Sequence, residues 1–170
     1  HHNYTSILEH VSRKEGEQYL NIIREEYKMK DDEIFQILKP LMKVGNPKLL
    51  RIKGLSNKIS TTGLRYLKIA LDIKKITGSK IGNVVEIGCG YGGQAIILDQ
   101  LLQIESYTFY DLWQVNLLIK RFIENSNFRI FCDNTAYILT IFEKRINSKD
   151  LPFFLNLKNF LNKNNFKCPK

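Results

Sequence analysis

Four glycines follow an apolar run near the middle of this chain, and their spacing is typical of a loop that binds a ligand. Residues 84–94 read Val-Val-Glu-Ile-Gly-Cys-Gly-Tyr-Gly-Gly-Gln, and apolar residues resume at 95–98. This pattern predicts a buried parallel strand, a tight glycine turn and the first turn of a helix. Some turn positions need a positive φ, and others need a bare Cα so that a ligand can approach the backbone. We interpret the turn as a binding loop.

Two ligand classes use this construction. Gly88, Gly90 and Gly93 match the dinucleotide fingerprint G-x-G-x-x-G, in which a pyrophosphate sits at the helix N-terminus. Glu86, however, lies two positions before the first glycine, where a carboxylate would repel a pyrophosphate. It suits a cationic ligand with amine and hydroxyl donors, such as S-adenosylmethionine. Glu86 therefore favours S-adenosylmethionine over a dinucleotide.

The segments around the loop resemble a known enzyme family. The resemblance is carried by Ile-Ser-Thr-Thr-Gly-Leu-Arg-Tyr-Leu-Lys at 59–68, by the glycine segment at 85–94, and by Tyr-Thr-Phe-Tyr-Asp-Leu at 107–112 with Val-Asn at 115–116. From about 59 to about 122 the chain resembles the sugar O-methyltransferases of bacterial surface-polysaccharide clusters. This resemblance implies a Rossmann-like class I fold, S-adenosylmethionine as cofactor, and a sugar or glycan hydroxyl as acceptor in capsule or lipopolysaccharide biosynthesis.

Pattern and resemblance together give a set of expected cofactor contacts. The set is Arg65, Tyr66, Glu86, Gly88, Cys89, Gly90, Tyr91, Gly92, Gly93, Gln94, Asp111, Leu112 and Asp133.

The expected roles of individual residues leave alternatives open. Asp111 lies 23 positions beyond Gly88, the usual offset of an acid that binds ribose hydroxyls, but it could also cap the next helix. The resemblance makes Asp133 an adenine contact, and an Asp-Asn pair is equally an ordinary turn. Arg65 and Tyr66 could face the cofactor or lie on the surface. Cys89 could be a nucleophile, but a small residue filling a tight turn is favoured.

No catalytic base or metal site is identified. His1 and His2 are interpreted as the remnant of a purification tag, and His10 is the only other histidine. A lone histidine in this position is typical of a surface residue. The three cysteines are scattered without C-x-x-C spacing, so neither a disulfide framework nor a zinc site is indicated. A divalent metal could activate a sugar hydroxyl, but the sequence does not indicate one.

The remaining elements are expected on both sides of the loop. Residues 3–58 predict a helical appendage with two amphipathic helices, the second ending at Pro40 and Gly45-Asn46-Pro47. Ser60 or Thr61 should cap a helix that ends at Gly78. A crossover helix over 94–102 follows the loop. The second strand is expected at 107–110 and the third at 128–132, with an apolar-periodic helix between them.

The expected architecture is an α/β fold with a Rossmann-like methyltransferase sheet that is incomplete on its C-terminal side. Residues 1–58 would form the helical appendage and 59–170 the cofactor-binding domain. After Asn134 the sequence offers helices and an Asn/Lys tail but no convincing strand. Since an open parallel edge would aggregate, we expect a homo-oligomer, a neighbouring molecule or further chain to close it.

The composition limits the class of protein and the kinds of partner that the chain can have. The 170 residues are 44% hydrophobic and 25% charged, which is typical of a globular protein, and no apolar run approaches the ~20 residues of a membrane span. We therefore expect a cytoplasmic protein. The net charge of +9 is spread among acids, so a solvated basic surface is favoured over an anionic glycan, a lipid head group or nucleic acid. Two alternatives to methyl transfer remain: a nicotinamide-dependent oxidoreductase, and an inactive cofactor-binding fragment with an assembly role.

Overall fold

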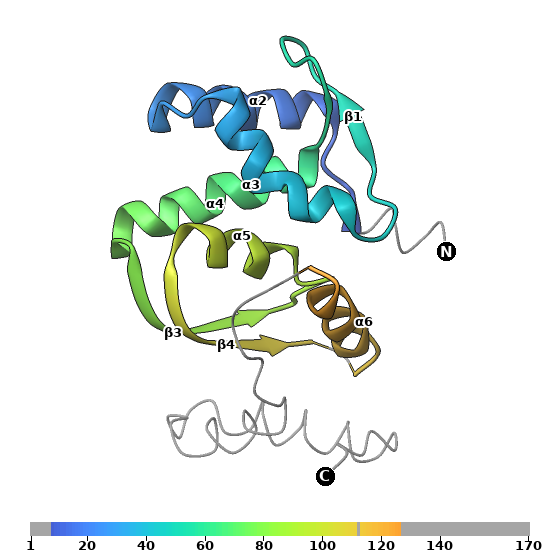
Figure 1. Cartoon of the computed structure of the whole chain (residues 1–170), viewed down its shortest axis with the longest axis vertical. Coiled ribbons are helices and arrows are strands. Elements are labelled where there is room, and N and C mark those ends of the chain that lie inside the picture. Colours follow the sequence, from blue (N-terminus) through green and yellow to red (C-terminus); the bar gives the residue numbers. More distant parts are fainter. Residues whose placement is uncertain (1–7, 112, 127–170) are drawn as a thin grey trace, which may run out of the picture. The chain divides into compact units, whose positions relative to one another are not determined.

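The computed structural model describes residues 8–111 and 113–126 (Figure 1). These residues form five helices and two sheets of two strands each, so the protein is a mixed α/β chain. In chain order the elements are α2 (Arg13–Tyr27), α3 (Asp31–Lys43), β1 (Leu49–Arg51), β2 (Lys58–Ser60), α4 (Thr61–Thr77), β3 (Lys80–Ile87), α5 (Gly93–Leu101), β4 (Gln103–Tyr110) and α6 (Trp113–Glu124).

Two capped amphipathic helices open the described chain, which confirms the prediction for this region. Ser12 and Glu15 form a reciprocal cap on α2: the Ser12 amide donates to Glu15 Oε2 at 2.8 Å, and the Glu15 amide donates to Ser12 Oγ at 3.3 Å. The backbone amide of Lys30 makes the equivalent bond to Glu33 at the start of α3. Both helices bury residues spaced three or four apart, namely Leu20, Ile23, Ile34, Leu38 and Leu41.

Of the two signals expected to end the second helix, Pro40 does not end it, because α3 continues to Lys43, whereas Gly45-Asn46-Pro47 follows directly after its C-cap at Val44. Proline removes one backbone hydrogen bond from the helix, and the buried Leu41 anchors the last turn in the core. A short hairpin was not predicted from the sequence. Strands β1 and β2 pair antiparallel with Leu50 opposite Ile59, and strands of three residues are too short to show an alternating pattern.

Helix α4 begins and ends where the sequence predicts. Ser60 Oγ accepts a hydrogen bond from the Gly63 amide at 3.0 Å, and Gly78 ends the helix with a φ of 82° and a bond from its amide to the Lys74 carbonyl. Figure 1 shows α4 between the N-terminal helices and α5. The helices α2 and α4 cross so closely that a Cβ on Gly16 would lie 2.5 Å from Thr61 Cγ2. A side chain at Gly16 would therefore push the two helices apart.

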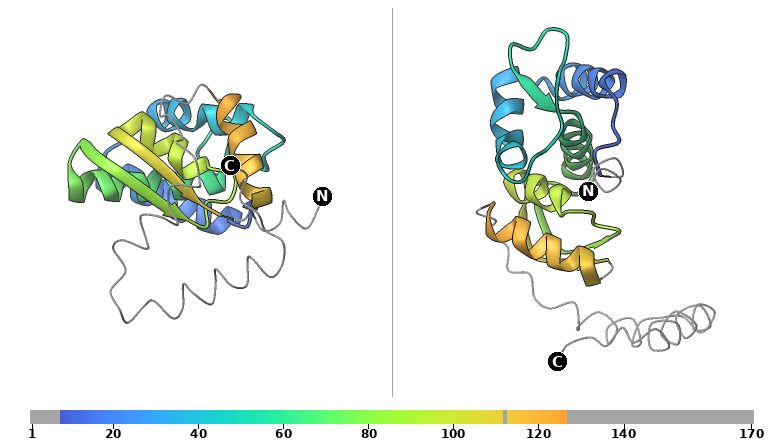
Figure 2. Two further views of the ribbon diagram at one scale, coloured as in Figure 1. Left: turned by 90° about the horizontal axis from the view of Figure 1, so that it is seen from below. Right: turned by 90° about the vertical axis from the view of Figure 1, so that its right-hand side faces the viewer.

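Strands β3 and β4 form a parallel pair joined by α5, and they run side by side in the views of Figure 2. In register, Val84 lies opposite Tyr107 and Glu86 opposite Phe109. Tyr107 and Phe109 are buried, but Val85 and Ile87 on the other face are 55% and 75% exposed. The prediction of a strand buried on both faces is therefore wrong for β3. An alternating pattern with exposed apolar residues cannot be told from a buried run by residue type alone.

The described residues show a two-stranded parallel sheet and not a Rossmann-like sheet. The third strand expected at 128–132 lies outside the described residues. The N-terminal helices and the βαβ unit share one hydrophobic cluster, which joins Leu20, Ile34 and Leu38 to Leu64, Leu67 and Ile97. The division of the chain at 58/59 into two domains stays a prediction.

We predict that Lys28→Gly stabilises the protein by about 1 kcal/mol, because Lys28 ends α2 in the left-handed conformation with a φ of 55°. A side chain costs energy in that region and glycine does not. Chemical denaturation would measure the gain. Lys30→Gly is the control, since Lys30 has an extended backbone and should lose stability. A loss in both variants would contradict the prediction.

Candidate functional site

The glycine turn lies between the carboxyl end of β3 and the first residue of α5. The Gly88 amide donates to the Tyr110 carbonyl at 2.8 Å, and the Gly92 amide donates to the Cys89 carbonyl at 2.9 Å. Gly88, Gly90 and Gly92 have φ values of 73°, 56° and 85°, which confirms the expected need for positive φ. A Cβ added to Gly88 would meet no atom of residues 8–111 and 113–126 within 4 Å. The backbone at Gly88 is therefore open to a ligand.

Asp111 holds the turn from the end of the neighbouring strand. Its Oδ2 accepts a hydrogen bond from the Gly90 amide at 3.1 Å, and its main-chain carbonyl accepts one from Asn116 Nδ2 at 3.1 Å. A carboxylate on a backbone amide fixes the loop conformation. The sequence suggested a ribose contact or a helix cap for Asp111, and it did not predict this link to Gly90. The ribose role stays a prediction.

Glu86 is a half-buried acid of the site. Tyr107 donates its hydroxyl hydrogen to Glu86 Oε2 at 2.8 Å. Burial raises the pKa of Glu86 to about 7; the Tyr107 hydrogen bond opposes this shift, and the negative charge of Asp111 adds to it. Near neutral pH, Glu86 is thus a mixture of its neutral and charged forms. A positive charge nearby would favour the carboxylate.

Cys89 fills the turn as a buried thiol. Its side chain is 3% exposed, and Sγ donates to the Glu86 carbonyl at 3.0 Å. Burial raises the pKa of the Cys89 thiol to about 12. Because the thiolate is the nucleophilic form, Cys89 is unreactive at neutral pH. The geometry therefore supports the interpretation that a small residue fills a tight turn.

Aromatic residues from α4 and the loop pack against the start of α5. A Cβ on Gly93 would lie 2.7 Å from Tyr66 Cε2 and 2.8 Å from Tyr91 Cε2. The rings of Tyr66 and Tyr91 lie edge to face with centroids 6.2 Å apart, and Tyr91 contacts Phe122 of α6 in the same way at 4.9 Å. Burial raises the pKa of Tyr66 to about 12 and raises the pKa of Tyr91 as well. Both phenols are therefore neutral at physiological pH.

Gln94 and Arg65 make contacts within the protein. Gln94 Nε2 donates to the Tyr66 carbonyl at 3.1 Å, which ties α5 to α4. Arg65 lies over the ring of Tyr66, 5.8 Å from its centroid, and its Nη1 is 2.8 Å from His10 Nε2. His10 is exposed, as the sequence analysis expected for a surface residue. Cofactor roles for Gln94 and Arg65 stay predictions.

A segment at the start of the described chain reaches the loop, and the sequence analysis missed it. A Cβ on Gly90 would lie 3.1 Å from Leu8 Cδ2, and Thr61 Oγ1 donates to the Val11 carbonyl at 2.7 Å. Glu9 is buried beside Thr62, and burial raises the pKa of its carboxyl. About eighty residues separate this segment from the loop, so no local pattern could reveal the contact.

Leu112 and Asp133 lie outside the described residues. Within 8–111 and 113–126, no group of three or more His, Cys, Asp or Glu residues could hold a metal ion. Over the same ranges, no helix is long and apolar enough to cross a bilayer.

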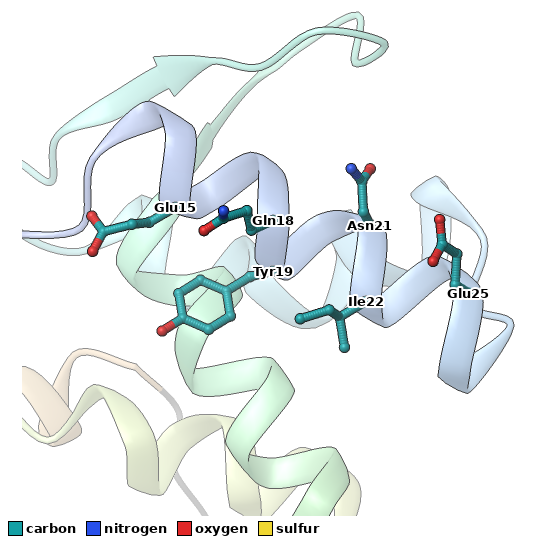
Figure 3. Close-up of a pocket in the computed structure, with 6 residues that line it drawn as sticks. All are labelled: Glu15, Gln18, Tyr19, Asn21, Ile22 and Glu25. Atoms are coloured by element: carbon teal, nitrogen blue, oxygen red, sulfur yellow. The ribbon is translucent and has the colours of Figure 1, made fainter.

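Two surface hollows of the described region lie away from the glycine loop. One, of about 530 Å³, is lined by α2 alone (Figure 3). The other, of about 730 Å³, is lined mainly by the end of α2, by α3 and by α4. Neither hollow contains an expected cofactor contact.

Comparison with known proteins finds similarity to homoserine kinases over a minor part of the chain. The homoserine kinase of Sinorhizobium medicae is 51% identical over 47 residues, which cover 28% of this chain and 14% of the relative. The homoserine kinase of Beijerinckia indica is 41% identical over 63 residues, which cover 36% of this chain and 20% of the relative. The chain thus spans about one seventh to one fifth of the relatives that it matches. No family model and no solved structure matches the chain.

These matches overturn the identification of the chain as a sugar O-methyltransferase, together with the glycan-biosynthesis function and its oxidoreductase and inactive-fragment alternatives. What is found instead is partial similarity to homoserine kinases, which are not methyltransferases. The physical reason for the error is that a glycine turn after a strand reports only how a backbone approaches a ligand. The same construction serves many unrelated activities.

Proposed function

We propose that the glycine loop between β3 and α5 binds a ligand that combines a nucleoside with a positively charged group. S-adenosylmethionine is the first such ligand to test. The observation that carries this proposal is the open backbone of Gly88, which lies two residues after Glu86 in the loop whose Gly90 amide is bonded to the Asp111 carboxylate. Ligands of parallel α/β units bind at the carboxyl ends of the strands, which is where these residues lie. Ligand binding, rather than any reaction, is what the site supports.

The charges at the loop support a cation over a phosphate. Glu86 is half-buried and has a pKa of about 7, so a bound cation would recover part of the energy lost in removing its carboxylate from water. A phosphate in the same place would meet two carboxylates. S-adenosylmethionine carries a permanent sulfonium charge and ribose hydroxyls, and it has no phosphate.

A nucleotide is the second candidate, and the partial similarity to homoserine kinases favours it. On this alternative the chain would be part of a kinase-related enzyme. Kinases place metal ions between nucleotide phosphates and protein carboxylates. Glu86 and Asp111 could accept a triphosphate only with a divalent cation between them. Binding of a nucleotide here should therefore require magnesium.

The unit β3–α5–β4 supports the prediction that the complete sheet is Rossmann-like. A parallel pair of strands with a crossover helix is the repeating unit of such sheets. A neighbour or second copy that closes the sheet, and a cytoplasmic location, stay predictions from the sequence.

Isothermal titration of the full chain with S-adenosylmethionine, S-adenosylhomocysteine and ATP, each with and without magnesium, tests the proposal. We expect S-adenosylmethionine to bind without magnesium and more tightly than S-adenosylhomocysteine, which lacks the sulfonium charge. Magnesium-dependent binding of ATP alone would replace the first candidate by the second. If no ligand binds, the proposal fails.

A further inference from the structure

We propose that Asn116 of α6 is a ligand contact that accepts a hydrogen bond from a ribose hydroxyl of the nucleoside. This inference rests on the proposed function of the glycine loop. Asn116 lies five positions after Asp111, the residue that holds the loop at Gly90. It would be a second residue of the same site that selects the ligand.

The amide group of Asn116 has a fixed orientation. Its Nδ2 donates to the main-chain carbonyl of Asp111 at 3.1 Å. Because a carbonyl only accepts, the nitrogen of the amide must face Asp111 and the oxygen must face the other way. The side chain therefore presents an acceptor, not a donor, on its remaining side.

That acceptor is buried without a partner. Asn116 Oδ1 has no hydrogen-bond partner in the part of the chain that the structure describes, and it is closed to solvent. Buried polar atoms are nearly always paired, because an unpaired one loses its bond to water and gains nothing in return. Asn116 is bonded to Asp111, the residue that holds the glycine loop, so the unpaired acceptor is explained if a ligand of this loop supplies the missing donor.

The chemistry of the acceptor limits what can bind there. An amide oxygen takes a hydroxyl or an amine, and it repels a phosphate or a carboxylate. Asp111 at the same strand end is the residue expected to hold ribose, and the ribose diol offers two donors. We therefore assign Asn116 Oδ1 to a ribose hydroxyl and not to a phosphate.

Analogues of the ligand test the assignment. The probe is S-adenosylhomocysteine, or ATP with magnesium if that is the ligand that binds, compared with its 2′-deoxy and 3′-deoxy forms. The native chain should bind one deoxy form about tenfold more weakly, which corresponds to one lost hydrogen bond. In Asn116→Leu this difference should disappear, because the partner of the hydroxyl has been removed. Asn116→Ala provides the same test if the leucine variant does not fold.

Asn125 supplies a matched control in the turn that follows α6. Its Nδ2 also donates to a main-chain carbonyl, that of Arg121 at 2.6 Å, but Asn125 is exposed. Asn125→Leu should keep both the affinity and the discrimination between analogues. If the native chain binds the probe but Asn116→Leu and Asn116→Ala discriminate as it does, the role of Asn116 is wrong and the proposed function stands. If the native chain binds no probe, both proposals fail.

Discussion

Glu86→Gln should raise the free energy of unfolding by up to about 3 kcal/mol at pH 8 and leave it almost unchanged at pH 4. Burial holds the pKa of Glu86 at about 7 in the folded protein, against an ordinary value of 4.5. Each unit of this difference corresponds to about 1.4 kcal/mol. Below pH 4.5 the carboxyl is protonated in both states, so folding loses nothing. As the pH rises from 4.5 to 7, the unfolded chain gives up the proton first, and stability falls.

Glutamine removes this penalty because it is neutral at every pH and keeps an oxygen for the Tyr107 hydroxyl. Urea denaturation of the native chain and the variant at several pH values would measure the effect. Glu105→Gln is the control, since Glu105 lies exposed on β4. If the two substitutions change stability equally across this pH range, the pKa of Glu86 is not raised in the folded protein.

The same substitution should weaken ligand binding while it strengthens the fold. Affinity for S-adenosylmethionine should increase as the pH rises through about 7, because Glu86 becomes a carboxylate that attracts the sulfonium. In Glu86→Gln this pH dependence should be lost. Titration calorimetry at pH 6 and pH 8 would show it, and an unchanged pH profile in the variant would remove Glu86 from the binding site.

Gly88→Ala should reduce ligand affinity by about a hundredfold or more. The Cβ would meet no atom of the described residues within 4 Å, so it would project into the space that the ligand is proposed to occupy. A methyl group between backbone and ligand prevents close approach. The positive φ of 73° adds a cost in stability of about 1–2 kcal/mol.

Gly78→Ala separates these two effects. Gly78 has a similar φ of 82°, and an added Cβ would also meet no atom of the described residues within 4 Å, but Gly78 ends α4 at the other end of β3 from the loop. Both variants should melt at similarly lowered temperatures, and only Gly88→Ala should lose binding. If Gly88→Ala binds like Gly78→Ala, the ligand does not contact this part of the loop.

The sequence by itself determined the local elements around the loop. The caps at Ser60 and Gly78, the positive-φ glycines after β3 and the two amphipathic N-terminal helices all follow from interactions between residues a few positions apart. Such interactions leave a readable pattern, because the residue types and their spacing are themselves the cause. Pro40 is the exception within this group, since the burial of Leu41 outweighs a local signal.

Only the tertiary structure determined which residues of the site contact one another. The bonds of Asp111 to Gly90 and of Tyr107 to Glu86, and the approach of Leu8 to Gly90, join residues separated by 21 positions or more. The raised pKa of Glu86 depends on burial by several elements at once, and the exposed face of β3 depends on what packs beside it. The glycine motif suggested an activity that the comparisons contradict, because backbone geometry at a strand end is set by close approach to a ligand and not by the reaction the ligand undergoes.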